Sequence, residues 1–121
     1  MNSKKPYDLD ERTFIFARDV ALLVNRLPHT LPNIEYSKQL IRSSASVGAN
    51  YIEANENLGE KDALFRFKIC RKEAKESAYW LRLIMATMND RTNNEEIDTL
   101  ILEANELKLI LSSIINKKKS I

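Results

Sequence analysis

Basic side chains gather in the segment 60–88, at spacings that put them on one side of a helix. Four lysines are separated by steps of seven, four and three residues, and two arginines flank them: Lys61, Lys68, Lys72, Lys75, Arg71 and Arg82. Such steps return to the same face of an α-helix. Across 60–88, seven basic residues stand against four acidic ones, a local net charge of +3. Because such a face can neutralise phosphates and release counterions, we predict a binding surface for RNA or DNA.

An ordinary solvated helix face is the alternative. Glu73 and Glu76 lie about one helical turn from several of these cations. Ion pairs between residues three or four apart would cancel much of the local charge. The whole chain carries 19 Lys and Arg against 17 Asp and Glu, a formal net charge of +2. A total charge this small does not by itself favour a polyanionic partner.

A second polar group combines residues from two segments: Arg42, Asn50, Glu53 and Glu76. Asn50 and Glu53 are one helical turn apart and can share hydrogen bonds, whereas Arg42 lies too far along the helix to reach either. A carboxylate on a tightly packed helix needs a cation or a donor, which the basic residues of 60–88 could supply. We predict a structural network that fixes helix register or subunit number. A catalytic carboxylate pair is the alternative, although no nucleophile or metal ligand stands nearby in the sequence.

Other catalytic chemistry has little support. His29 is the only histidine and falls in a proline-containing connection, so we expect a surface residue. Cys70 is the only cysteine and falls among apolar positions, which predicts a small core residue and excludes a multi-cysteine zinc site. The chain has no Glu-x-x-His pair for a di-iron site and no glycine-rich phosphate loop. We therefore expect no metal, no cofactor and no enzymatic activity.

Long helices must position these residues. The 121-residue chain contains two glycines and three prolines, too few for the many tight turns of a β-sandwich. Breaks at 27–33, 55–59 and 89–94 divide it into helices at about 10–27, 34–57, 60–88 and 94–117. Short connections make neighbouring helices antiparallel. We therefore predict one all-α domain over residues 1–121, an up-down-up-down four-helix bundle.

Apolar residues recur in steps of three and four along the last two helices, the pattern of helices that cross at about 20°. The seam of 60–88 is Ala63, Phe67, Cys70, Ala74, Ser77, Leu81, Ile84 and Met88, and that of 94–117 is Ile97, Leu100, Ala104, Leu107, Leu111 and Ile114. The helix at 34–57 has an apolar stripe that ends at Leu58. Its small polar residues, Ser43 among them, are expected on the far side.

Two helices carry more apolar surface than a four-helix monomer needs. The helix at 34–57 has a second stripe at Ile41, Ala45, Gly48 and Ile52, with Gly48 allowing a close helix approach. A helix that is apolar on two sides has partners on two sides. We predict a homo-oligomer with an interface that includes Tyr51, Phe65, Ile69 and Trp80. The alternatives are a monomer whose wide stripes face three other helices, and aromatic side chains that stack on bases.

The compartment follows from what the sequence lacks. No apolar run reaches the roughly 18 residues of a transmembrane helix, and Met1–Lys5 does not open a signal peptide. We expect a cytoplasmic protein with no membrane partner.

Two segments resemble a known family. The runs from Gln39 to Ala54 (QLIRSSASVGANYIEA) and from Phe67 to Leu81 (FKICRKEAKESAYWL) are similar to signatures of bacterial four-helix bundle proteins of the 23S rRNA intervening-sequence family. The segment from Phe14 to Leu27 also fits the first helix of that family. The resemblance covers roughly residues 10–115.

The resemblance implies a four-helix bundle that assembles as a barrel-like homopentamer, with no established enzymatic activity. Genes of the family lie within insertions in large-subunit rRNA genes and elsewhere in bacterial genomes. The chain is more distantly similar to accessory variability proteins of diversity-generating retroelements, which bind nucleic acid and a reverse transcriptase. Two hypotheses result: an oligomer that binds nucleic acid through the basic face, or an adaptor oligomer whose ligand is another protein.

Overall fold

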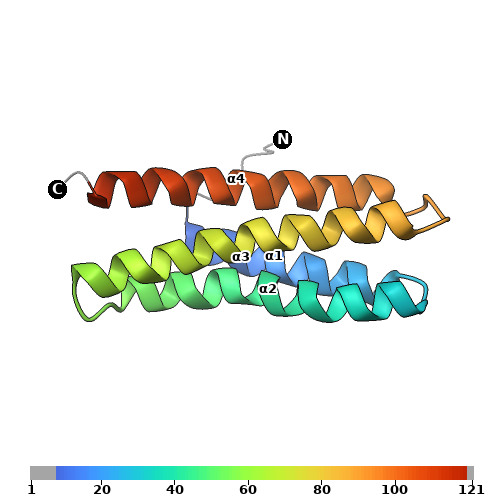
Figure 1. Cartoon of the computed structure of the whole chain (residues 1–121), viewed down its shortest axis with the longest axis horizontal. Coiled ribbons are helices and arrows are strands. Elements are labelled where there is room, and N and C mark those ends of the chain that lie inside the picture. The colour runs from blue at the N-terminus through green and yellow to red at the C-terminus, as the bar shows by residue number, and fades with distance from the viewer. Residues whose placement is uncertain (1–7, 120–121) are drawn as a thin grey trace.

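Four helices make up almost all of the computed structural model, which describes residues 8–119 (Figure 1). They are α1 (Leu9–Arg26), α2 (Leu31–Asn55), α3 (Glu60–Thr87) and α4 (Asn94–Lys119). No strand occurs within residues 8–119. The expected all-α class and number of helices are therefore confirmed.

Local hydrogen bonds explain where the helices begin. The Asp8 carboxylate accepts from the amide of Asp10 and starts α1. The Thr30 hydroxyl accepts from the amide of Asn33 and starts α2. Because proline is tolerated in the first helical turn, Pro32 lies inside α2 and the helix begins three residues before the expected position. Gly59, with a φ of 132°, occupies the left-handed region just before α3.

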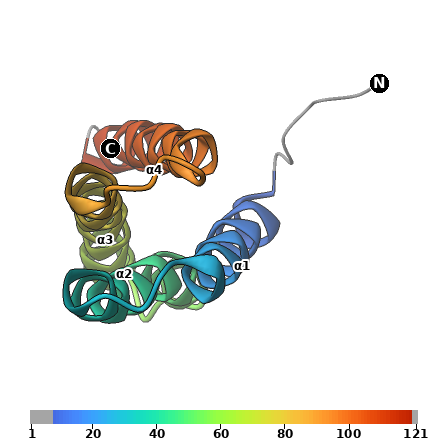
Figure 2. The same ribbon diagram turned by 90° about the vertical axis from the view of Figure 1, so that its right-hand side faces the viewer.

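The helices follow each other around a single apolar core (Figure 2). Consecutive helices pack side by side, and α3 lies between α2 and α4. The contact between α1 and α4 is the least extensive of the four helix pairs. As a result α3 buries residues against two neighbours, while α1 depends mainly on α2.

The seams expected on the last two helices lie in this core. The structure differs from the expected pattern only near the ends of helices. Seven of the eight positions of the α3 seam, from Ala63 to Ile84, are buried, and the eighth, Met88, is half-buried just after the end of α3. At the end of α4 the buried residue is Ile115, and Ile114 is half-buried. A straight helix has 3.6 residues per turn, so a strict seven-residue repeat drifts off the core face. Leu58 was expected to extend the stripe of α2 but is exposed, because α2 ends at Asn55.

The small residues of α2 allow it to approach its neighbours closely. Ser43 was expected on the far side of α2, and this is wrong: it is fully buried, and its hydroxyl lies 2.9 Å from that of Ser77 on α3. Ser77 also donates to the carbonyl of Glu73, so these buried hydroxyls have partners. On the other side of α2, a Cβ at Gly48 would lie 2.9 Å from the hydroxyl of Thr13. The expected close approach at Gly48 is confirmed.

A cluster of charged side chains, Arg12, Glu103 and Glu106, connects α1 to α4, the helix pair with the least extensive contact. The guanidinium of Arg12 donates from Nε and Nη2 to Glu103, at 2.7 and 3.0 Å, and from Nη2 to Glu106 at 2.7 Å. The side chains of Arg12 and Glu103 are only 11% and 15% exposed. The hydrogen bond from Arg12 to Glu103 raises the pKa of the guanidinium above its usual value. Two charges this close to the core are stable there because each neutralises the other.

No helix within residues 8–119 is long and apolar enough to cross a membrane. The expectation for Met1–Lys5 lies outside the described residues.

The Arg12 cluster gives a direct stability prediction. Replacing Arg12 with alanine removes the guanidinium hydrogen bonds to Glu103 from a site that is shielded from water, and we expect the free energy of unfolding to fall by about 2 kcal/mol. Urea unfolding followed by circular dichroism measures this loss. The matched control is Arg18→Ala on the same helix. Its ion pair with Asp19 is exposed, so the expected change is within about 0.5 kcal/mol.

Candidate nucleic-acid interface

A basic groove lies between α3 and α4. Its volume is about 400 Å³, and its lining residues are Lys68, Arg71, Lys72, Lys75, Lys108 and Ser112. The first four come from α3 and the last two from α4. The structure therefore brings together four of the six basic residues that the α3 spacing singled out, and adds a cation and a hydroxyl from α4.

The groove follows from how α3 packs. Its apolar seam faces the core, and each lysine comes one or two residues after a seam position, so the lysines lie on the opposite side of the helix at the surface. On α4 the seam residues Leu107 and Leu111 are each followed directly by a groove residue, Lys108 and Ser112. The guanidinium of Arg71 donates to the Ser112 hydroxyl across the groove at 3.4 Å.

The positive charges of the groove are not neutralised by carboxylates of residues 8–119. None of its four lysines, nor Arg71, forms an ion pair with another residue in the described range 8–119. The two glutamates that could have paired with them turn to the other side of α3. Glu73 and Glu76 both bind the guanidinium of Arg42 on α2, with Glu73 Oε1 at 3.3 Å from Arg42 Nη1.

This sorting of charges removes one argument for an ordinary solvated face, the cancellation of positive charge by Glu73 and Glu76. An intrahelical pairing of Glu73 and Glu76 with the lysines would have cancelled the positive charge. Because Arg42 takes both carboxylates, the groove keeps five cations around a cavity. A cavity that gathers charge of one sign attracts ions of the opposite sign.

The remaining basic residues lie outside the groove. Lys61 and Arg82 are exposed on α3 but do not line the cavity. Arg82 borders a separate hollow with Tyr79 and Leu83. Lys118 of α4 pairs with Glu60 at 3.9 Å and lies over the ring of Phe67.

The proposed polar network divides into separate parts. Arg42 and Glu76 meet, and Glu76 also accepts a hydrogen bond from the indole of Trp80 at 2.9 Å. Asn50 lies elsewhere: its amide nitrogen donates to Ser46, and its oxygen accepts from Arg66 at 3.3 Å. Glu53 is exposed, and its carboxylate makes no hydrogen bond or ion pair with the other residues of 8–119. The first two parts connect α2 to α3 without Glu53.

The four residues suggested for a subunit interface have different surroundings. Trp80 stacks on Tyr36 of α2 with ring centroids 5.9 Å apart, and Tyr51 packs against Phe67 of α3 at 6.0 Å. Both rings are half-buried by these contacts within the chain. Ile69 is half-buried as well, whereas Phe65 is exposed.

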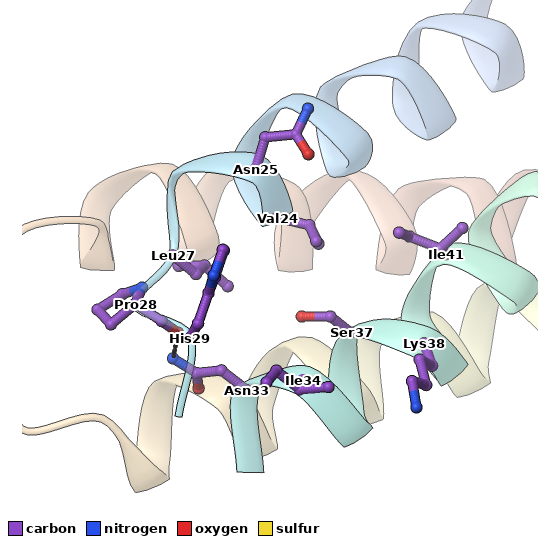
Figure 3. Close-up of a pocket in the computed structure, with 10 residues that line it drawn as sticks. All are labelled: Val24, Asn25, Leu27, Pro28, His29, Asn33, Ile34, Ser37, Lys38 and Ile41. Atoms are coloured by element: carbon purple, nitrogen blue, oxygen red, sulfur yellow. Dashed lines mark hydrogen bonds between the residues drawn. The ribbon is translucent and has the colours of Figure 1, made fainter. Parts of the chain in front are cut away.

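A second cavity, of about 220 Å³, lies where α1 turns into α2 (Figure 3). Its lining includes Val24, Leu27, Ile34 and Ile41, with Ser37 and His29 at its polar side. The side-chain amide of Asn33 donates from Nδ2 to the carbonyl of Pro28 and closes the turn beside the cavity. No carboxylate lines this cavity, so the residues around it do not form a serine–histidine–acid arrangement.

The other candidate nucleophile is Cys70 in the core. It is fully buried, and burial raises the pKa of its thiol to about 12. Because the thiolate is the reactive form, Cys70 is an inert core residue, as its position in the seam indicates. Within residues 8–119 no group of three or more His, Cys, Asp or Glu side chains is placed to hold a metal ion.

Sequence reasoning missed several residues because their partners lie on other helices. Lys108 and Ser112 join the groove only through the register of α4 against α3. Their spacing of four residues beside the α4 seam was the available signal. Arg12 gave no signal, because its partners Glu103 and Glu106 are some ninety residues away in the chain.

Together, four packed helices and a basic groove define a small all-α protein with one strongly cationic face. The chain belongs to the family of the 23S rRNA-intervening sequence protein, whose model matches residues 7–113. It is similar to a crystal structure of a protein of unknown function from the S23 ribosomal protein family of Bacteroides thetaiotaomicron. The two are 30% identical with a TM-score of 0.79, over 89% of this chain and 95% of that chain. No curated protein matches the chain.

The contact of Arg42 with both glutamates is open to a direct test. We expect Arg42→Ala to lower the free energy of unfolding by about 1–2 kcal/mol, because the buried Glu73 loses its charged donor. Urea unfolding gives the value. Lys38→Ala on the same helix removes an exposed pair with Glu35, and its expected effect is below about 0.5 kcal/mol. Equal losses in the two variants would contradict a structural role for Arg42.

Proposed function

We propose that the chain binds nucleic acid, RNA in the first place, through the basic groove between α3 and α4, and does so as a cytoplasmic protein. The observation that carries this proposal is the set of five cations around one cavity that have no carboxylate partner among residues 8–119. The proposal assigns no reaction to the groove. Phosphates are the chemical groups that such a set of lysines and an arginine would recognise.

The groove also explains the kind of recognition we expect. Lysine ammonium groups contact phosphates as point charges, and contacts to phosphates carry no sequence information. Binding would therefore depend on salt and little on sequence. Membership of the 23S rRNA-intervening sequence protein family is consistent with an RNA ligand.

Charge reversal in the groove tests the proposal. We expect Lys68→Glu with Lys72→Glu to weaken binding of a labelled structured RNA at least tenfold, since two phosphate contacts become repulsive. Fluorescence anisotropy at several salt concentrations measures both the affinity and its salt dependence. The slope of log affinity against log salt concentration should decrease in magnitude by about two, one for each lost phosphate contact.

The control changes the same total charge elsewhere. Arg18→Glu with Lys38→Glu alters exposed residues of α1 and α2 outside the groove. If this control weakens binding as much as the groove variant, the net charge of the molecule and not the groove is responsible. Circular dichroism of both variants checks that the helices persist. Absence of binding by the unchanged protein at low salt would contradict the proposal and favour the adaptor hypothesis.

We further propose that up-down-up-down bundles of this chain associate as a homo-oligomer, a pentamer as the family resemblance implies. Support comes from exposed apolar residues of α2 that repeat along one helix face: Ile34, Ile41 and Ile52. Ile34 and Ile41 line the cavity beside α1, so this face lies at the boundary between α1 and α2. Apolar side chains in such a row are covered in an assembly.

Sedimentation at micromolar concentration tests the assembly. We expect a mass several times the 14.0 kDa of the chain. Ile41→Glu with Ile52→Glu should reduce it to 14.0 kDa, because burying carboxylates in an apolar interface is unfavourable. A mass of 14.0 kDa for the unchanged protein would contradict the proposal.

A further inference from the structure

Two exposed aromatic rings stand among the cations on the outer face of α3. Phe65 is 58% exposed and Tyr79 is 52% exposed. Phe65 comes four residues after Lys61 and seven before Lys72; Tyr79 comes seven residues after Lys72. Steps of four and seven stay on one helix face. The face that carries the lysines therefore also carries a ring toward each end.

The ring of Tyr79 is held in place although it is exposed. It makes an edge contact with Trp80, with centroids 5.1 Å apart and planes at 70°. Trp80 is fixed in turn by stacking on Tyr36 and by its hydrogen bond to Glu76. A ring that is already oriented loses little conformational freedom when a ligand stacks on it.

We propose that this face selects single-stranded nucleic acid, with phosphates along the groove cations and unpaired bases stacked on Phe65 and Tyr79. This inference rests on the proposed nucleic-acid function and adds the class of strand. In a duplex the base faces are already stacked on one another, so no base face inside it is available to stack on an exposed ring. Unpaired bases of any sequence present a π face, and aromatic residues beside a basic track are the usual means of binding them.

The dimensions suit a short stretch of strand. Phe65 and Tyr79 are about four helical turns apart, which corresponds to about 21 Å along the axis at 1.5 Å per residue. Lys68, Lys72 and Lys75 lie between them. A strand of several nucleotides can therefore touch both rings while its backbone passes the cations, within the site sizes of about 4–16 nucleotides known for such surfaces.

The charge of the face argues against a protein ligand at the same place. An apolar partner surface would have to remove water from the surrounding lysines, which have no carboxylate partners among residues 8–119. A polyanion instead supplies the opposite charges as it binds. The subunit contact suggested for Phe65 is the competing interpretation, and the experiment below includes it as an outcome.

The test compares two probes and three proteins by fluorescence anisotropy. The probes are a labelled 15-nucleotide RNA of mixed, unstructured sequence and the blunt duplex formed with its complement, each at the same series of salt concentrations. The proteins are the unchanged chain, Phe65→Leu with Tyr79→Leu, and the control Phe14→Leu. Phe14 is an equally exposed phenylalanine, at 63%, on α1 away from the groove.

We expect the unchanged protein to bind the single strand at least fivefold more tightly than the duplex. The double leucine variant should bind the single strand at least fivefold more weakly, with its duplex affinity and salt dependence unchanged, because its cations remain. Phe14→Leu should match the unchanged protein with both probes. Emission of the only tryptophan, Trp80, should change when the single strand binds, through its contact with Tyr79.

Three outcomes would overturn the inference. Equal affinity for both probes, with sensitivity to Lys68→Glu and Lys72→Glu retained, would leave a nucleic-acid function without strand selection. A drop in sedimented mass of the leucine variant that accompanies weaker binding would assign Phe65 to a subunit contact. No binding of either probe at low salt would remove both the inference and the function on which it rests.

Discussion

The division of charge on α3 is the constraint on which the rest of the structure depends. This helix packs against α2 and α4 at once, so most of its polar residues are confined to the surface that faces away from the core. Arg42 of α2 takes up both Glu73 and Glu76 on one side of that surface. The lysines are left on the other side, beside Lys108 of α4. One arginine thus fixes where the negative charge lies and, by doing so, leaves the positive groove open.

The sequence predicted the features that depend on periodicity within one helix. The number of helices, their approximate ends and the buried seam of α3 all follow from spacing and from breaks in the chain, and the structure confirms them. The same regularity placed Lys68, Arg71, Lys72 and Lys75 on one face, and the structure brings them into one groove. Periodicity is informative here because residues on one helix share a fixed geometry whatever surrounds them.

Features that depend on pairing between helices could not be predicted in the same way. Ser43 looked like a solvent-facing residue because it is polar, yet its partner Ser77 makes burial favourable. Glu73 and Glu76 could equally have paired along α3, and only the position of Arg42 decides otherwise. Arg12 and Glu103 are joined across almost the whole length of the chain. In each case the register between two helices supplies the information, and register is set by packing that a single sequence does not reveal.

The uneven distribution of charge over the bundle has a consequence for how the molecule approaches a charged ligand. With a net charge of +2, the protein has little overall attraction for a polyanion and little repulsion from its own copies. The charge is nevertheless unevenly distributed: five cations line the groove between α3 and α4, while Glu73 and Glu76 lie on the side of α3 that faces Arg42 of α2. The field of a polyanion orients a protein with such a charge distribution, so for the ligand that we propose, collisions would begin with the groove facing the strand. Orientation in solution, more than total charge, would then govern how often an encounter becomes a complex.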